Sequence, residues 1–491
     1  MNITGQDLIN MGLAPGKHFK MALEVARNAE ADGLPRAEIT GIVMERFGAV
    51  AQIKKLSLGV PKPVNVACRP ENEEEEINLD GSLSKMRELT QVPVVERAAL
   101  MPDNCPSGME WGSIPVGGAI VTKNSVIPAA HSADVNCGMW ATFFKDGRMP
   151  VRDLMVNLAG STVFGPYPAP RGEENPHNVL LEEVWDNPFL SGLEDAAVRY
   201  LGTKGDGNHF SYVGKMLVTQ DIIRGLEDGG HYETAKALYP EVGNTINALV
   251  THHGSRNFGA KIYKRGLDAA VKETALIAEG IPKTGAWLDL DTEIGASYWK
   301  ALGYVGRWTS ANHEVIHAKF LRKIGASPIT KINNHHNAVW KHNGEIYHGK
   351  GATPAWKIDG QRQLGIIPLN MGREILLVSG NDNTDFLSFA PHGAGRNRSR
   401  TATIKPFINA STGKVNPELV AVAIAEETRG IEVVWASGVP DVSESPRGYK
   451  DATKIKTEIE RYDLATVIGE ITPLGCVMAG HIEPTWRKRK S

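Results

Sequence analysis

The sequence predicts an α+β fold, in which mixed sheets and helices form one large domain with a small N-terminal helical appendage. Short apolar runs typical of strands alternate with helix-like segments, without the regular spacing of a β/α barrel. From about residue 60 to 480 there is no proline- or serine-rich linker, low-complexity segment or fixed-period repeat. We therefore expect a helical appendage at residues 1–55 and a single main domain at residues 56–491.

The first fifty residues have the pattern of short helices separated by turn residues. Thr4 can cap a first helix, and Gly16 precedes apolar residues at helical spacing. Gly33 can end that second helix, and Pro35 suits the first position of a third, which Gly48 ends. This segment is predicted to be all helical.

The main domain should begin with KKLSLGVPKPVNVAC (54–68), which has β-branched and alternating character. The strand-like runs are AIVTKNSVI (119–127), MWATFF (139–144), HFSYVG (209–214), ILLVSG (375–380) and TVIGEI (466–471). The helix-like segments are DLMVNLAG (153–160), DIIRGLEDG (221–229) and PELVAVAIAEET (417–428). The acidic run from Glu71 to Glu76 is expected to be a solvated loop, because like charges repel one another.

Composition excludes several classes of protein. A net charge of −2 gives no global attraction for nucleic acid or membrane, so any polyanion must meet a local basic patch. Apolar residues at 42% and charged residues at 22% fit a globular protein rather than a disordered chain. The four cysteines form no CxxC pair, which excludes a disulfide scaffold and a zinc ribbon. With a polar N-terminus and no long apolar run, the expected location is cytoplasmic.

Four of the fifteen histidines have unusual neighbours. His209, His252, His336 and His392 lie in the polar segments GDGNHF (205–210), HHGSRNFG (252–259), NNHHN (333–337) and PHGAGRNRSR (391–400). A core histidine usually has apolar neighbours. For one such residue a hydrogen-bonded turn histidine is the simpler interpretation, whereas four of them in one chain favour a functional site.

The segment ADVNCGM (133–139) adds two further candidate ligands, Asp134 and Cys137. One tight turn can direct both side chains at a single centre. A carboxylate, a thiolate and imidazoles together suit a borderline divalent ion. A buried apolar role is the alternative for Cys137, but an unpaired carboxylate three residues away would be costly in a core. The set would be sufficient for two ions if the thiolate bridges them.

Basic residues accompany these segments in glycine-rich surroundings. They are Arg256 in HHGSR, Lys350 in HGKGAT, and Arg396 and Arg400 in HGAGRNRSR. Singly, each would be a solvated surface charge. Together, beside loops that offer backbone N–H groups, they resemble a phosphate-binding track. A metal centre, a histidine nucleophile and a phosphate track are typical of phosphoryl or nucleotidyl transfer.

The motifs DVNCGM, GxGNHF, HHGSR, HHN, HGKGAT, PLNMG, HGAGRxxSR and SPRGYKD occur in the order seen in the RtcB family of RNA ligases. The resemblance covers about residues 60–480. It implies an RtcB-like catalytic domain that joins an RNA 3′-phosphate or 2′,3′-cyclic phosphate to a 5′-hydroxyl. It also implies GTP and manganese as cofactors, and a role in RNA repair or tRNA processing. No membrane or protein activator is implied.

The resemblance implies specific roles for the candidate residues. Two manganese ions, or another divalent metal, would be bound by Asp134, Cys137, His209, His252 and His336, with Cys137 shared. His392 would become guanylylated. The implied nucleotide-binding positions are Asn208, Phe210, Tyr212, Asn337, Pro368, Asn370, Met371, Ile375, Gly393, Ala394, Gly395, Tyr449 and Ala479. RNA phosphates would be held by Arg256, Lys350, Arg396 and Arg400.

The base-contacting positions depart from the family pattern. Tyr212 stands where the family has an acid, Ile375 replaces a serine, and Ala479 replaces a lysine. Guanine offers N–H donors that a carboxylate accepts well, so we predict a weakened or replaced preference for GTP, with the base stacked on Tyr212 or Tyr449. Alternatively, Asn370 or the basic tail WRKRKS restores a guanine contact. In the early motif MPDNC, Cys105 takes the place of the family's histidine.

Two other functions remain open from the sequence. The same metal centre could act as a phosphoesterase on RNA ends, or the chain could be a non-ligating, RNA-binding RtcB paralogue. The N-terminal helices loosely resemble the RNA-binding regions of tRNA nucleotidyltransferases, and a packing role is the alternative. A covalent nucleotide on His392 would separate a ligase from a hydrolase.

Overall fold

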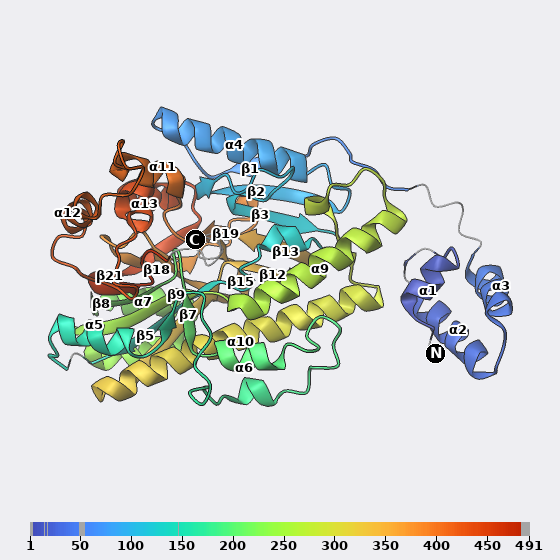
Figure 1. Ribbon diagram of the computed structural model, residues 1–491, viewed down its shortest axis with the longest axis horizontal. Coiled ribbons are helices and arrows are strands. Elements are labelled where there is room, and N and C mark those ends of the chain that lie inside the picture. Colours follow the sequence, from blue (N-terminus) through green and yellow to red (C-terminus); the bar gives the residue numbers. More distant parts are fainter. Residues whose placement is uncertain (1–2, 14, 17, 49–54, 146, 483–491) are drawn as a thin grey trace.

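The computed structural model describes residues 3–13, 15–16, 18–48, 55–145 and 147–482. It has the mixed α+β architecture predicted from the sequence, with helices packed around two large sheets (Figure 1). Within these described residues, no helix is both long and apolar enough to cross a membrane. The expected cytoplasmic location stays a prediction, as does the division of the chain at residues 55 and 56.

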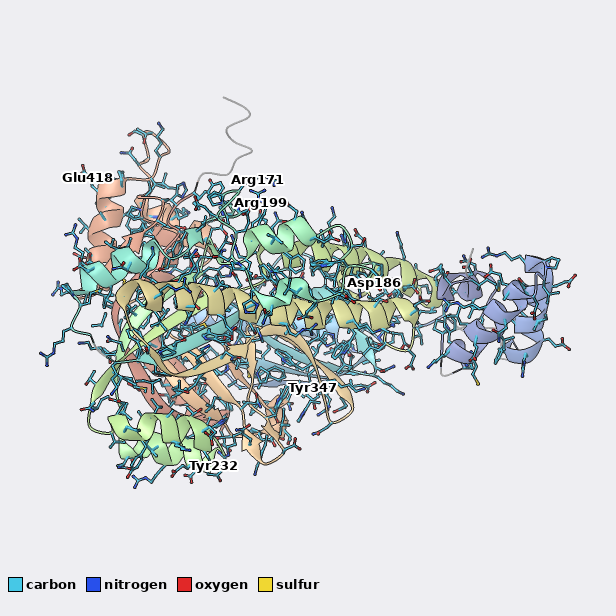
Figure 2. All side chains as sticks on the ribbon, turned by 90° about the horizontal axis from the view of Figure 1, so that it is seen from below. Arg171, Asp186, Arg199, Tyr232, Tyr347 and Glu418 are labelled. Atoms are coloured by element: carbon cyan, nitrogen blue, oxygen red, sulfur yellow. The ribbon has the colours of Figure 1, made fainter. Side chains whose placement is uncertain are left out.

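The N-terminal helices form a group at one end of the molecule (Figures 1 and 2). They are α1 (Gly5–Asn10), α2 (Phe19–Ala31) and α3 (Arg36–Phe47). As predicted, Thr4 caps α1, and it forms a reciprocal capping box with Asp7. Pro35 is the N-cap of α3 rather than its first helical residue, so α3 begins one residue later than predicted, at Arg36. The buried side chains of these helices, including Leu8, Phe19 and Val43, form a cluster of their own.

The larger sheet has eight strands and nearly closes into an antiparallel barrel. Its order is β11 (Pro328–His335), β5 (Gly138–Phe144), β9 (Thr245–His253), β8 (Phe210–Leu217), β21 (Ala465–Met478), β18 (Ile375–Gly380) and β17 (Leu364–Pro368), with β20 (Glu432–Trp435) beside β21. The two ends of the sheet meet where Asn334 of β11 accepts a hydrogen bond from the Ile366 backbone in β17. The predicted strands at 139–144, 209–214, 375–380 and 466–471 are confirmed within this sheet.

A second sheet of five strands lies beside the barrel. Its order is β1 (Val64–Val66), β2 (Val95–Cys105), β3 (Val116–Thr122), β13 (Glu345–Lys350) and β12 (Asn337–His342). The predicted run at 119–127 divides into β3 and β4 (Ser125–Val126) at a turn in which Asn124 has a positive φ of 47°. From the segment at 54–68, only Val64–Val66 becomes a regular strand.

Short strand pairs and helices complete the body. The pairs are β10 (Leu288–Asp289) with β4, β6 (Val163–Phe164) with β7 (Thr203–Gly205), β14 (Ala352–Pro354) with β19 (Phe389–Pro391), and β15 (Lys357–Ile358) with β16 (Gln361–Arg362). The helices are α5 (Val151–Ala159), α6 (Glu194–Tyr200), α7 (Gln220–Asp228), α8 (Tyr232–Leu238), α9 (Arg256–Ile277), α10 (Glu293–Ile324), α11 (Arg400–Ile404), α12 (Pro417–Glu427) and α13 (Ala452–Arg461). Figure 2 shows Glu418 of α12 and Tyr232 of α8 on opposite sides of the body. The predicted helices at 153–160, 221–229 and 417–428 are therefore confirmed.

The acidic run is a helix, not the expected loop. Helix α4 (Glu73–Leu89) begins inside it, and Asn72 caps the helix by accepting a hydrogen bond from the Glu75 backbone at 3.0 Å. Four glutamates fill the first turn, where the positive end of the helix dipole stabilises negative charge. Repulsion between neighbouring charges is weaker than this combination of cap and dipole.

The long helix α10 anchors the barrel from outside. Thr292 caps its start, and Gly325 ends it with a left-handed φ of 66°. Its His313 and His317 side chains reach Thr251 of β9 at 2.6 and 2.8 Å, and His317 also reaches Thr142 of β5 at 2.8 Å. These buried bonds fix the strands β5 and β9 that lead to the candidate site.

Candidate metal centre and nucleotide cavity

One rim of the barrel gathers most of the residues singled out in the sequence. Cys137 directly precedes β5, His209 precedes β8, His252 is the second-to-last residue of β9, and His336 follows β11. Because neighbouring strands are antiparallel, the start of one strand and the end of the next meet at the same rim. Segments up to 200 residues apart in sequence thus meet at one place.

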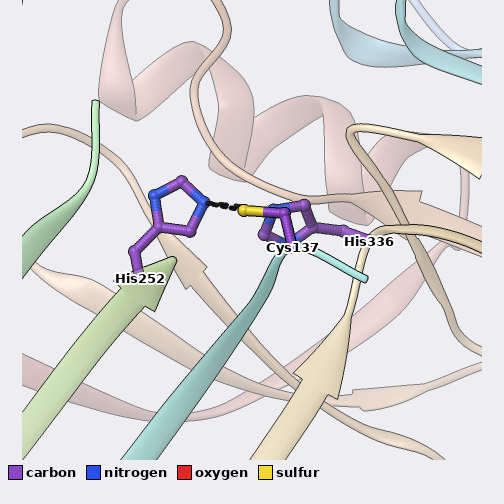
Figure 3. Close-up of side chains that lie close together, drawn as sticks. All are labelled: Cys137, His252 and His336. Carbon is purple, nitrogen blue, oxygen red and sulfur yellow. Dashed lines mark hydrogen bonds between the residues drawn. The ribbon is translucent and has the colours of Figure 1, made fainter. Parts of the chain in front are cut away.

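The side chains at this rim form two overlapping groups. Cys137, His252 and His336 are one group (Figure 3), and Asp134, Cys137 and His209 are the other. Within each group the candidate ligand atoms lie within 4.8 Å of one another. Cys137 Sγ lies 3.2 Å from His252 Nε2 and 3.7 Å from His209 Nε2. His252 Nε2 is 3.1 Å from His336 Nε2, and His209 Nε2 is 2.9 Å from an Asp134 oxygen.

The orientation of His252 suits metal binding. Its Nδ1 lies 3.2 Å from the backbone oxygen of Asn208, which accepts a hydrogen bond from Nδ1–H and leaves the lone pair of Nε2 facing the group. Burial lowers the pKa of His252 and of His336 well below the usual value, and repulsion from nearby histidines lowers each further. Neutral imidazoles are the form that ligates metals.

Cys137 and Asp134 differ in protonation. Burial, reinforced by the Asp134 charge, raises the pKa of the Cys137 thiol well above its ordinary value. Burial also acts to raise the pKa of Asp134, but the charge and hydrogen bond of His209 outweigh it and lower that pKa. Gly254 is required beside this carboxylate, because a Cβ there would lie 2.0 Å from Asp134 Oδ1.

His392 lies against the first group and is held from behind. Its ring centroid is 4.8 Å from that of His336. The fully buried carboxylate of Asp103, in β2, accepts hydrogen bonds from the His392 backbone N–H at 3.1 Å and from Nδ1 at 2.5 Å. This contact assigns the proton to Nδ1 and leaves Nε2 as the atom with a free lone pair. Gly395 allows the loop to approach, since a Cβ there would lie 2.0 Å from the Asp103 backbone oxygen.

A cavity of about 630 Å³ opens beside His392 and both groups. It is lined by most of the predicted nucleotide positions: Asn208, Phe210, Tyr212, Asn337, Pro368, Asn370, Met371, Ile375, Gly393, Ala394, Gly395 and Tyr449. Ala479 is buried in a different apolar cluster and is not among the described lining residues. The tail WRKRKS lies outside the described residues.

Three of the four predicted phosphate-binding residues line this cavity, namely Lys350, Arg396 and Arg400. Lys350 donates hydrogen bonds to Ser107 Oγ at 2.6 Å and to the Ile114 backbone at 3.0 Å. Arg256 is not among the described lining residues, and its guanidinium donates hydrogen bonds to Thr203 Oγ1 and to the Gly165 backbone oxygen.

The sequence interpretation missed three charged residues near the site. Asp103 lies in an apolar strand, where a carboxylate needs a partner. Glu444, in SESPRGYKD, is buried and receives Arg400 Nε at 2.7 Å and the Tyr449 hydroxyl at 2.7 Å. Lys204 is fully buried, and burial lowers its pKa well below the ordinary value. A charge within an apolar or glycine-rich segment was the available signal for Asp103 and Lys204.

Known proteins similar to this chain belong to one family. Residues 173–479 match the family model described as tRNA-splicing ligase RtcB. The chain is 27% identical over 422 residues to the RNA-splicing ligase RtcB of Escherichia coli strain K12, covering 78% of this chain and 90% of that protein. It is 25% identical over 434 residues to the tRNA-splicing ligase RtcB of Pyrobaculum aerophilum, covering 76% of this chain and 86% of that protein. The chain therefore belongs to the RtcB family of tRNA-splicing ligases, as a distant member.

Proposed function

We propose that this protein is a metal-dependent RNA ligase that joins a 3′-phosphate or 2′,3′-cyclic phosphate end to a 5′-hydroxyl end through a nucleotide carried on His392. One observation supports this most strongly. Cys137 belongs to both candidate metal groups, and the ring of His336, a member of one of them, packs against His392. Two metal positions and a nucleophile would then border one cavity.

The donor set fits the two divalent ions that we propose. A carboxylate, a thiolate and three imidazoles suit manganese, zinc or similar ions. His252 Nε2, His336 Nε2 and the Cys137 sulfur lie within 4.8 Å of one another, a spacing at which one cation could bind all three. Bound ions would neutralise charge on the triphosphate and on the RNA phosphate.

The residues of the chain would act in three successive transfer steps. Asp103 fixes the His392 ring so that Nε2 attacks the α-phosphorus, forming an N–P bond while the bond to the β-phosphate oxygen breaks and pyrophosphate leaves. An oxygen of the RNA 3′-phosphate then attacks the same phosphorus, and the N–P bond breaks. The 5′-hydroxyl oxygen of the second RNA finally attacks the 3′-terminal phosphorus, the anhydride P–O bond breaks, the nucleoside monophosphate leaves, and the hydroxyl proton passes to water. A cyclic phosphate must first be opened by water.

The basic residues that line the cavity would hold the RNA. Lys350 and Arg400 both line the cavity, one from the end of β13 and the other from the start of α11. Arg396 also lines the cavity, with its guanidinium carbon 4.9 Å from the Tyr449 ring centroid and an ion pair to Glu444 at 3.5 Å. Arginine and lysine at these places provide the positive charge that the near-neutral chain lacks globally.

A ligation assay tests this function. Two RNA strands, one ending in a 3′-phosphate and the other beginning with a 5′-hydroxyl, are incubated with the protein, manganese and nucleoside triphosphates. We expect a joined product whose formation His392→Ala abolishes and His481→Gln, at an exposed histidine, leaves unchanged. Loss of the terminal phosphate without joining would contradict the proposal and assign the site to a phosphoesterase.

A further inference from the structure

One wall of the cavity is apolar. It is formed by Phe210, Tyr212, Ile375, Cys476 and Met478, from strands β8, β18 and β21, and is called here the apolar wall. Phe210 is its partly exposed ring, whereas Tyr212 is only 1% exposed. The proposed metal and phosphate chemistry uses none of these side chains.

The apolar wall lies beside both the metal groups and His392. The Phe210 ring centroid is 5.5 Å from that of His252. On the other side, the turn at Pro368 touches the His392 loop, since a Cβ added to Gly393 would be 3.1 Å from the Pro368 oxygen. A planar ring on this wall would therefore lie next to the phosphorus that His392 attacks.

Polar groups at the apolar wall are already engaged. The Tyr212 hydroxyl donates to the Ile471 backbone oxygen at 3.0 Å. The backbones of β8 and β21 pair with each other along the wall, from Phe210 opposite Met478 to Tyr212 opposite Cys476. The wall thus presents carbon and sulfur to a ligand, rather than donors and acceptors.

Two of the side-chain acceptors that line the cavity, those of Asn370 and Glu444, already have donors. Asn370 Oδ1 accepts from the Gly372 backbone at 2.9 Å. Glu444 receives Arg400, Tyr449 and Arg396 at its two oxygens. Among the described lining residues the only other carboxylate is Asp134, which belongs to the metal groups. No unengaged carboxylate in this part of the structure faces the N1–H and N2 amino donors of a guanine.

We propose that the base of the activating nucleotide packs on the apolar wall and is recognised as a flat ring rather than by its hydrogen-bonding edge. This inference rests on the proposed function. A site that hydrogen-bonds a substrate edge rejects an analogue lacking the group by about 10⁴-fold, whereas apolar contact discriminates far less. The cavity then accepts purine nucleoside triphosphates without selecting guanine.

Equilibrium competition tests the inference without requiring catalysis. A fluorescent, ribose-labelled GTP bound to the full-length His392→Ala variant with manganese is displaced by GTP, ITP, ATP or inorganic tripolyphosphate. ITP lacks the 2-amino group of guanine. The adenine of ATP presents a donor at position 6 and an acceptor at N1, where guanine presents an acceptor and a donor. We expect the three purine nucleotides to compete within about tenfold of one another, and tripolyphosphate to be at least about tenfold weaker.

Three results would overturn the inference. GTP binding more than about tenfold tighter than ITP or ATP would show that the edge is read. Tripolyphosphate competing as well as the nucleotides would show that the wall contributes nothing. Absence of any nucleotide binding would remove the base site altogether.

Two variants test whether a polar side chain at the cavity reads the base. Tyr212→Phe removes only a hydroxyl already bonded to Ile471, and Asn370→Ala removes a cavity-lining amide whose oxygen accepts from Gly372. We expect neither to change the ratio of GTP to ATP affinity by more than about threefold. A larger change in either variant would show that its side chain reads the base, against the inference.

The inference and the proposed function can fail separately. Wild-type protein that binds purine nucleotides equally, yet never forms a nucleotide adduct or a joined RNA, leaves the base site standing and refutes the ligase mechanism. Strong GTP selectivity together with an adduct on His392 would refute the inference about the base and support the ligase mechanism.

Discussion

Cys137 is the residue on which the proposed two-metal centre depends, because its sulfur belongs to both ligand groups. Burial and the Asp134 charge hold its pKa well above the ordinary value, so the metal-free protein carries a thiol at neutral pH. A thiolate is the form that binds a metal, so metal binding must release that proton. Apparent metal affinity should therefore fall as pH is lowered.

Replacing Cys137 with Ala should remove most of the bound metal. The shared ligand is lost from both groups, so we expect manganese per chain, measured by elemental analysis after dialysis, to fall from about two to below one. Cys476→Ala is the matched control, since this buried cysteine lines the cavity but belongs to neither group. A Cys137→Ala protein that keeps its full metal content and ligation rate would rule out the shared-ligand arrangement.

Lys350 provides a pH dependence with a defined sign. Burial lowers the pKa of its amine to about 8, so the positive charge is present below pH 8 and is lost above it. Binding of a 3′-phosphorylated RNA should weaken as pH rises through about 8 in the wild type. In Lys350→Arg, whose side chain stays charged, this step should disappear. Unchanged affinity of the wild type from pH 7 to 9, measured by fluorescence anisotropy, would exclude Lys350 from phosphate binding.

Among the elements, α4 shows why local charge patterns are insufficient. The acidic run predicted a loop, but the Asn72 cap and a partner distant in sequence stabilise a helix there. Glu75 is 4% exposed and forms an ion pair with Lys454 of α13, which is 8% exposed. That partner lies 379 residues away, so no local pattern could indicate it.

Breaking this ion pair should destabilise the fold. Lys454→Met leaves the Glu75 charge buried without its partner, which costs about 3–5 kcal/mol and lowers the unfolding temperature. The double variant Glu75→Met with Lys454→Met should recover most of that loss, because no charge remains uncompensated. If thermal unfolding of the single variant matches the wild type, the pair contributes no stability and the connection of α4 to α13 has another basis.

The positions of strands and helices along the chain were more predictable than their arrangement in space. Apolar runs such as 139–144 and 375–380 became strands because both faces of the barrel are buried. Helices 153–160 and 221–229 followed their periodicity. Sequence order alone could not show that Cys137, His252 and His336 share one rim, because that depends on long-range strand pairing.

For a similar reason, the sequence indicated some of the candidate site residues and missed others. Residues in polar loops, such as His392, stand out from their neighbours. Asp103 and Glu444 act through partners contributed by other segments, so their roles emerge only from the tertiary contacts. Arg256 and Ala479 resemble site residues in the motif order, yet neither lines the cavity.

At the scale of the whole molecule, the proposed site lies between the two large sheets. The barrel rim contributes the metal groups, whereas the five-stranded sheet contributes Asp103 and Lys350. His392 follows directly after β19. Strand β19 pairs with β14, and β14 begins directly after Lys350 and Gly351. Packing of one sheet against the other therefore determines whether His392 meets the candidate metal groups.

A covalent nucleotide on His392 is the central expectation of this account. Full-length protein is incubated with manganese and an α-labelled nucleoside triphosphate, and the adduct is mapped by peptide mass spectrometry at alkaline pH. We predict an acid-labile nucleoside monophosphate on His392 that is absent in His392→Ala. In Asp103→Asn the adduct should be reduced by about 10²-fold, because this variant no longer fixes the Nδ1 proton. An adduct that persists in His392→Ala, or one mapped to Lys204 instead, would contradict the account.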